Sequence, residues 1–327
     1  MRKGTGTLKP NRSKVYRYLI SCVSVCALAV WIPSPARAIL LTQVKHLFDI
    51  SHRFNYPSDV AVSKEGRIHI VDGVNNTVKI FNYDGVYFSS FGRAGSNDGE
   101  LQQPLGIDID AFGRIYIADA GNHRVQIFNA DGEFMAQIPI PATDRHAGDP
   151  TDVVVDVGGN RCYVVDNDNH RVLAFNLTNS KLINAYGKPG TANLEFKYPF
   201  MITLDKNRSL YIVDVTNTRV QVLNPSGLFV GNIGGWGVEK GEFFRPKGVA
   251  VDKDNRVFVS DSYMGVIQVF KPTGEFHAVV GDPSNHAVKK FKTPVGLFID
   301  HNNRLYVVEM IANRVGVYSI QGDARSY

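Results

Sequence analysis

The sequence contains little cysteine, and this limits its redox chemistry. Three cysteines occur among 327 residues, and two of them, Cys22 and Cys26, lie in the N-terminal segment. Cys162 is the one cysteine of the remaining sequence, so that part has no pair for an intrachain disulfide. Cys162 stands in an apolar run at a position that Ile, Leu or Val occupies elsewhere in the chain. This favours a small buried side chain over a nucleophile.

Several signatures of catalysis and of helical structure are missing. The sequence has no nucleophile elbow, phosphate-binding loop, dinucleotide fingerprint or haem-attachment motif. It also has no stretch with the sustained 3.6-residue period of an amphipathic helix. Hydrophobic residues nevertheless make up 44% of the chain, which excludes a disordered protein.

Acidic residues are absent from the first 38 residues, which contain seven Lys or Arg. The formal net charge of the whole chain is +5. Without residues 1–38 the chain has 29 basic and 31 acidic side chains, so its net charge becomes −2. No basic excess then remains to neutralise phosphates, and we expect no nucleic-acid partner.

The N-terminal segment has the three parts of a secretory signal. A basic region is followed by the apolar run 19–32 and by the small-x-small sequence Ala36-Arg37-Ala38. We predict a signal peptide over residues 1–38, export to the periplasm or the extracellular space, and no stable membrane insertion after cleavage. The alternative is an uncleaved membrane anchor, but an apolar run of 14 residues is shorter than the ~20 needed to span a bilayer.

The rest of the chain repeats itself every 47 or 48 residues. One unit reads IYIADAGNHRVQIFN from Ile115 to Asn129, and the pattern occurs six times. Its acidic residue recurs at Asp72, Asp119, Asp166, Asp214, Asp261 and Glu309. A proline ladder places the starts of the units near Pro57, Pro104, Pro150, Pro199, Pro246 and Pro294. We therefore predict that residues 39–327 form one domain of six units.

Each unit has room for four strands. Short runs rich in β-branched and aromatic residues alternate with Gly, Asn, Asp and Pro. In the second unit the runs are 106–110, 114–119, 124–129 and 133–138. The first three runs are apolar at nearly every second position or more, as expected for strands packed between neighbouring sheets. Four-stranded antiparallel units repeated around an axis predict an all-β, six-bladed β-propeller.

The units resemble the NHL repeat. Its pattern runs Pro-x-Gly-Val-Ala-Val-Asp, then Ile-Tyr-Val-Ala-Asp, then Asn-x-Arg-Val-Gln-Val-Phe, and the match covers nearly all of residues 39–327 in six tandem copies. The resemblance implies a six-bladed propeller, in agreement with the repeat count. Propellers of related shape include amidating lyases, gluconolactonases and strictosidine synthases, so an enzyme has to be considered.

The sixth unit lacks a fourth strand. Its third strand is expected to end at residues 318–321, whereas residues 41–49 (LTQVKHLFD) form an unassigned strand before the first unit. We predict that residues 41–49 complete the last blade, because such pairing removes two open sheet edges.

One sector departs from the repeat toward apolar side chains. The departures are Trp236, Phe244, Tyr263, Met264 and Met310, none of which the repeat requires. Apolar residues gathered on a surface are typical of a protein interface. The alternative is that they pack against one another. We predict that they bind a protein or peptide partner, and we expect a monomer.

Two carboxylates stand near the expected channel entrance. Asp59 and Asp152 replace a glycine of the repeat, with Lys247 expected across the channel. We expect no cofactor; the alternatives are Ca²⁺ held by Asp59 and Asp152, or a water-filled funnel with a loose ion pair. The sequence thus favours a secreted, non-catalytic propeller that binds a protein or peptide on its loop-rich face. The alternative is a metal-dependent lyase or lactonase at the channel mouth.

Overall fold

The chain folds almost entirely into β-strands. The computed structural model describes residues 39–325, so the predicted signal peptide lies outside the described residues. The described part contains 25 strands and the short 3-10 helix η1 (Ala120–Asn122). No helix of the described residues is long and apolar enough to cross a membrane.

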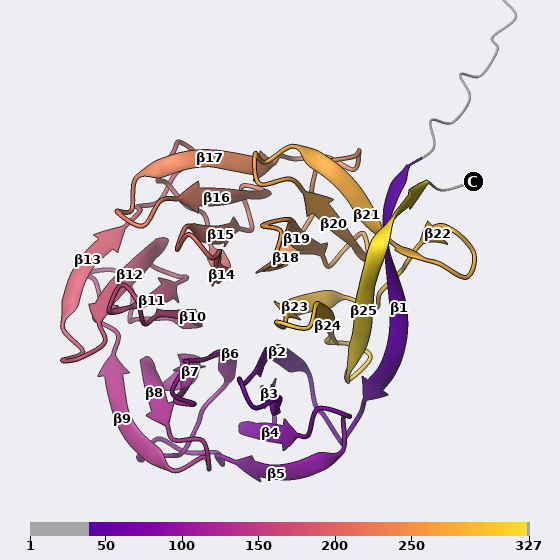
Figure 1. Cartoon of the computed structure of the whole chain (residues 1–327). Coiled ribbons are helices and arrows are strands. Elements are labelled where there is room, and N and C mark those ends of the chain that lie inside the picture. Colours follow the sequence, from indigo (N-terminus) through magenta and orange to yellow (C-terminus); the bar gives the residue numbers. More distant parts are fainter. Residues whose placement is uncertain (1–38, 326–327) are drawn as a thin grey trace, which may run out of the picture. The chain divides into compact units, whose positions relative to one another are not determined.

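Four of the blades are separate four-stranded antiparallel sheets made of consecutive strands (Figure 1). Blade 1 comprises β2 (Pro57–Val62), β3 (Ile68–Asp72), β4 (Thr77–Phe81) and β5 (Tyr87–Phe91). Blade 2 comprises β6 (Pro104–Ile109), β7 (Ile115–Asp119), β8 (Arg124–Phe128) and β9 (Phe134–Pro139). Blade 3 comprises β10 (Pro150–Asp156), β11 (Arg161–Asp166), β12 (Arg171–Asn176) and β13 (Leu182–Tyr186). Blade 4 comprises β14 (Pro199–Leu204), β15 (Leu210–Asp214), β16 (Arg219–Leu223) and β17 (Phe229–Gly234).

Blades 5 and 6 are joined into one sheet by the N-terminal strand. Blade 5 comprises β18 (Pro246–Val251), β19 (Val257–Asp261), β20 (Val266–Phe270) and β21 (Phe276–Asp282), and β22 (Ala287–Val288) pairs with β21. Blade 6 comprises β23 (Pro294–Ile299), β24 (Arg304–Glu309), β25 (Arg314–Arg325) and β1 (Leu40–Ile50). β1 is antiparallel to β25 and parallel to β21. The prediction that the N-terminal strand closes the last blade is confirmed, and so is the six-bladed propeller.

The third strand of blade 6 is longer than we predicted. The sequence suggested an end at residues 318–321, but β25 continues to Arg325. The extension is paired, because Leu40 and Leu41 of β1 lie opposite Arg325 and Ala324. The expected end was wrong because the partner strand, and not the local turn signal, determines where β25 stops.

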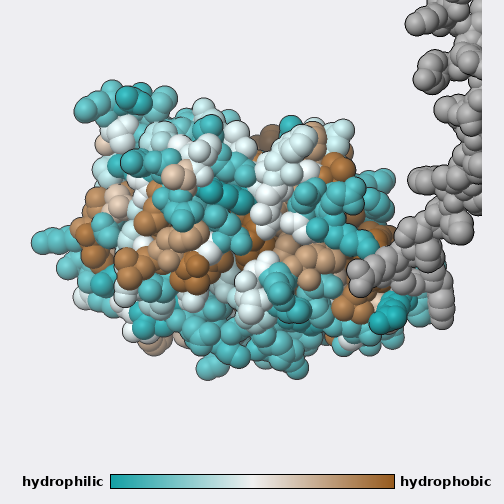
Figure 2. Space-filling view, turned by 90° about the horizontal axis from the view of Figure 1, so that it is seen from above, coloured by the Kyte–Doolittle hydropathy of each residue, from teal (hydrophilic) through white to brown (hydrophobic). Residues whose placement is uncertain are grey.

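The apolar core is divided into layers between neighbouring blades. Val71 of blade 1 packs in one cluster with Ile117 and Phe128 of blade 2. Each inner strand therefore has apolar neighbours on both faces, which explains its nearly continuous apolar sequence. Large apolar residues of the loops between blades are also buried, at Leu101, Phe196, Phe243 and Phe291. In the side view of Figure 2, apolar residues gather across the middle of the propeller wall between hydrophilic rims.

The first strand of each blade faces the central axis (Figure 1). Each of these strands begins at a repeat proline, which suits a position where a strand starts and needs no ladder donor. The residues that follow five of these prolines line one cavity at the entrance of the central channel: Ser58, Leu105, Phe200, Lys247 and Val295. We call this side the loop-rich face, because it also carries the loops between blades, such as residues 235–245, and the turns between second and third strands.

Candidate functional site

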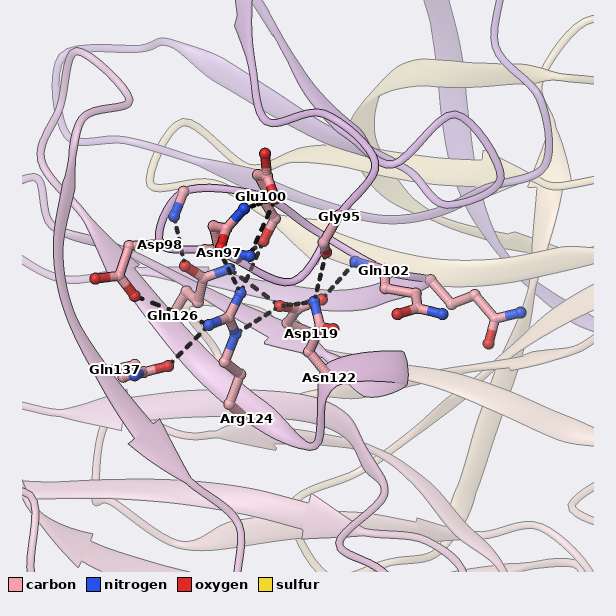
Figure 3. A network of polar contacts seen from close by, with 12 residues as sticks. Gly95, Asn97, Asp98, Glu100, Gln102, Asp119, Asn122, Arg124, Gln126 and Gln137 are labelled. Atoms are coloured by element: carbon pink, nitrogen blue, oxygen red, sulfur yellow. Dashed lines mark hydrogen bonds and ion pairs between the residues drawn. The ribbon is translucent and has the colours of Figure 1, made fainter.

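A buried carboxylate organises the turn between the second and third strands of blade 2 (Figure 3). Asp119 is fully buried and accepts hydrogen bonds from Arg124 Nε at 2.9 Å and from Asn122 Nδ2 at 2.8 Å. It also accepts the backbone N–H of Gln102 at 2.7 Å, which ties the loop before β6 to the turn. All parts of this network are mutually satisfied, so it braces the turn and offers no free acid or base.

The same pairing recurs in other blades, as expected for a structural device. The Nε-to-carboxylate distances are 2.7 Å for Arg171–Asp166, 2.9 Å for Arg219–Asp214 and 2.8 Å for Arg314–Glu309. Blade 1 has Thr77 where the arginine is expected, and sequence reasoning missed its substitute. Lys79 Nζ lies 2.6 Å from Asp72 Oδ2, so a lysine two residues further along β4 supplies the cation.

In blade 5 the carboxylate of the corresponding turn, Asp261, is stabilised without a cation. Val266 replaces the arginine, and no ion pair with Asp261 is found among the described residues. The Asp261 carboxylate instead accepts backbone N–H groups of Phe244, Arg245, Tyr263 and Met264, at 2.7–3.1 Å. Because only the backbones of Phe244 and Tyr263 are needed here, their side chains are not committed to the turn.

Three aromatic side chains are exposed in this sector, and we call Trp236, Phe244 and Tyr263 the blade-5 aromatic patch. The exposed fractions are 78% for Trp236, 67% for Tyr263 and 38% for Phe244. The rings of Phe244 and Tyr263 contact each other, with centroids 4.2 Å apart. Trp236 forms a backbone bridge to Phe243, the residue next to Phe244. The loop geometry does not need a tryptophan, because Ala94 and Pro189 form the corresponding bridges of blades 2 and 4.

The two methionines of the predicted site are placed differently. Met264 is half-buried in the turn beside Tyr263. Met310 packs against the apolar cluster between blades 6 and 1 and lines a cavity at the channel mouth. The structure therefore brings Phe244 of the loop before β18 against Tyr263, which shares its turn with Met264, whereas Met310 belongs to a different feature.

Three carboxylates lie inside the channel. Asp59, Asp108 and Asp152 all line a narrow cavity of about 50 Å³. Each carboxylate links its blade to the next, because its Oδ2 accepts a backbone N–H of the following blade. Asp59 accepts the N–H of Ile107 at 3.1 Å, Asp108 that of Val155 at 2.7 Å, and Asp152 that of Ile202 at 2.8 Å. Asp108 was missed, although the corresponding positions of the other five units, Ala61, Val154, Thr203, Ala250 and Phe298, carry no charge.

Glycines of neighbouring blades make room for two of these carboxylates. A side chain at Gly296 would meet Asp59 Oδ1, and one at Gly106 would meet Asp152 Oδ1. A glycine at the third residue of units 2 and 6 is therefore a packing requirement where the neighbouring unit carries an aspartate.

The channel carboxylates are poor candidates for a Ca²⁺ site. Burial raises the pKa of Asp59 to about 8 and that of Asp108 to about 7, and burial together with the charge of Asp59 raises the pKa of Asp152. A raised pKa favours the protonated form, which is a weak cation ligand. Much of the cavity lining is aliphatic, whereas Ca²⁺ needs six to eight oxygens. The described residues contain no group of three His, Cys, Asp or Glu side chains placed to hold a metal ion.

The raised pKa of Asp59 predicts that stability falls as the pH rises from the ordinary pKa of the carboxyl to about 8. Its pKa is about 8 in the folded chain against an ordinary 3.8, so the folded state holds a proton that the unfolded state has lost. The corresponding stability is fully present below the ordinary pKa and is lost as pH rises through about 8, with a slope of up to ~1.4 kcal/mol per pH unit for one proton. We expect Asp59→Asn to reduce the loss of unfolding free energy between about pH 6.5 and about pH 9.

Urea unfolding at both pH values measures this effect. His69 does not interfere, because burial lowers its pKa to about 4 and its contribution changes only on the acid side of 6.5. The exposed Asp84→Asn is the control and should leave the wild-type pH dependence unchanged. An equal loss of stability in wild type and Asp59→Asn would contradict the assignment.

A larger cavity of about 830 Å³ opens on the loop-rich face at the channel mouth. Its lining includes Tyr56, Leu105, Phe200, Val295 and Met310, with Lys247 as the one charged residue among the described residues that line it. Lys247 Nζ lies 4.0 Å from the centre of the Phe200 ring. A cavity of this size with mostly apolar walls, a few polar side chains and one charged group is typical of a small-ligand site.

Two parts of the chain match known families. Residues 51–147 match a family described as a 6-bladed beta-propeller, and residues 243–270 match the NHL repeat. The chain is a six-bladed propeller, and residues 243–270 are an NHL repeat. No curated protein sequence matches it.

Solved structures support this fold. The propeller is similar to a streptogramin B lyase, with a TM-score of 0.62, 12% identity, and coverage of 86% of this chain and 98% of that one. It is also similar to a catalytically inactive virginiamycin B lyase from Staphylococcus aureus with quinupristin (TM-score 0.62, 15% identity, 85% and 87% coverage). A gluconolactonase from Xanthomonas campestris gives a TM-score of 0.63 at 14% identity, with coverage of 88% and 91%. At these identities the likeness establishes the propeller fold.

Proposed function

We propose that the protein is an exported, non-catalytic propeller that binds a protein or peptide partner on its loop-rich face. The observation that carries the proposal is the blade-5 aromatic patch. Trp236 and Tyr263 expose 78% and 67% of their surface, although the positions equivalent to Trp236 in the loops before blades 2 and 4 hold Ala94 and Pro189, and no other blade has an aromatic residue at the turn position of Tyr263. Exposed aromatic side chains that the fold does not require are typical anchors of protein interfaces.

The local structure suits such a role. The turn that carries Tyr263 and the loop that carries Phe244 are both fixed by the Asp261 carboxylate. The Phe244 and Tyr263 rings already contact each other, so little side-chain freedom remains to be lost on binding. A partner peptide would meet a preorganised apolar surface.

We expect the double variant Trp236→Ala with Tyr263→Ala to lose peptide binding and to keep its fold. A phage-displayed random peptide library selected on wild type supplies ligands, and titration calorimetry measures their affinities. Loss of two interface aromatics should weaken binding by about 2 kcal/mol or more, which is about 30-fold. The melting temperature should stay nearly unchanged, because both side chains are exposed.

Phe112 provides a matched control. It is 73% exposed and lies in a tight turn on the opposite face, so Phe112→Ala should leave peptide affinity at the wild-type value. A clear loss of stability in the double variant with peptide affinity intact would show that the patch is a small core of its own.

A second candidate is a lyase or lactonase-like enzyme at the channel mouth. The cavity of about 830 Å³ and the likeness to a lyase and a gluconolactonase favour it. Metal analysis of the purified protein separates the two candidates. One tightly held Ca²⁺ or Zn²⁺ per chain, lost in the variant Asp59→Asn with Asp152→Asn, would favour the enzyme. Protein free of bound metal that still binds peptides would favour the binding function.

A further inference from the structure

The channel-mouth cavity is built around one charged side chain. The residues that follow the repeat prolines form a ring at the channel entrance: Ser58, Leu105, Thr151, Phe200, Lys247 and Val295. All of them except Thr151 line the cavity. The two hydroxyl groups of the ring are already used, since Ser58 donates to the Leu105 carbonyl at 2.6 Å and Thr151 to the Phe200 carbonyl at 2.8 Å. Lys247 thus carries the remaining polar group of this ring.

The structure gives the Lys247 ammonium no counter-ion among the described residues. Its contact is the face of the Phe200 ring, 4.0 Å from Nζ. Burial lowers the pKa of Lys247, and repulsion from Arg245 lowers it further. The carboxyls deeper in the channel do not compensate, because burial raises their pKa values toward the neutral form. A half-buried amine in such surroundings gains most from an anion that enters the cavity.

We propose that the channel-mouth cavity binds an organic anion with an apolar body. The anionic group, such as a carboxylate, pairs with Lys247 Nζ, and the apolar body packs against Phe200, Leu105 and Met310. The volume of about 830 Å³ is large enough for a drug-sized molecule. The carboxylate comes either from a free small molecule or from the C-terminus of a peptide. This site is separate from the blade-5 aromatic patch, so it does not depend on the proposed peptide-binding function.

Titration calorimetry with matched acid and amide ligands tests the inference. The small pair is 2-naphthylacetate and 2-naphthylacetamide; the peptide pair is a short phenylalanine-ended peptide with a free or an amidated C-terminus. We expect wild type to bind at least one acid about tenfold or more tighter than its amide, as for a charge-assisted hydrogen bond. Preference for the naphthyl acid alone identifies a free carboxylate, and preference for the peptide acid identifies a chain terminus.

Variants of Lys247 locate the binding. Lys247→Met should abolish the preference for acid over amide, whereas Lys247→Arg should keep most of it. Lys64→Met, which changes an exposed lysine of a tight turn on the other face, should behave like wild type. Binding of no ligand below about 1 mM, equal affinity for acid and amide, or an unchanged preference in Lys247→Met would each overturn the proposal. The acid and amide comparison on wild type stands even if a variant does not fold.

Discussion

Deletion of residues 39–49 is expected to lower the melting temperature by about 10 °C or more, or to prevent folding. The deleted part of β1 buries Leu41 and Val44 almost completely, and it supplies the outer strand of blade 6. Removal would leave β25 and β21 with open edges and expose the core layer between blades 5 and 6. Thermal unfolding followed by circular dichroism measures the effect.

Two variants of the full chain separate the role of β1 from the effect of shortening. Leu41→Ala with Val44→Ala should lose much of the stability, because each truncation leaves a cavity in a buried layer. Lys45→Ala with His46→Ala changes exposed positions of the same strand and should cost little. An unchanged melting curve after the deletion would refute the stabilising role of the closing strand.

The fold was predictable because the repeat encodes each blade locally. Strands, turns and the acidic turn residue recur with a spacing of 47 or 48 residues, so every blade gives the same evidence again. The closing strand was predictable because the sixth unit lacked a fourth strand and residues 41–49 formed a strand that belonged to no unit. The two ends of a closed ring lie side by side, so this strand can complete the last blade. These strand and turn patterns lie within one unit, so they can be recognised without knowing which blades are neighbours.

The parts that the sequence did not reveal arise from contacts between blades. Lys79 replaces the expected arginine from a position two residues further along β4, and only the three-dimensional arrangement shows that its amine reaches Asp72. Asp108 joins Asp59 in the channel because neighbouring first strands approach each other there. Similarly, Met310 was grouped with Tyr263 on composition, but blade 6 directs it to the channel mouth. The position of a residue in the repeat predicts the fold of its unit. The contacts of a side chain that departs from the repeat depend on the adjacent unit.

The second large effect is expected from Arg124→Met, which should lower the free energy of unfolding by about 3 kcal/mol or more. Arg124 is almost fully buried and pairs with the fully buried Asp119 at 2.9 Å. Its guanidinium also donates to the backbone carbonyls of Asn97 and Glu100 at 2.8 and 3.0 Å. Methionine fills a similar volume without a charge, so the variant leaves the buried Asp119 carboxylate without its counter-ion and the Asn97 carbonyl without the arginine donor. Urea unfolding measures the loss.

Two comparisons decide whether the buried charge causes the loss. Arg93→Met removes another arginine of the same loop, but the Arg93 side chain is 81% exposed in its pair with Glu100, so the cost should stay below about 1 kcal/mol. Adding Asp119→Asn to Arg124→Met should recover part of the stability, because an amide can still accept the N–H of Gln102 and carries no charge. Blade 5 gives a natural precedent, since Asp261 there relies on backbone N–H donors in place of an arginine. If the double variant were as unstable as Arg124→Met, lost packing and not the unpaired carboxylate would account for the effect.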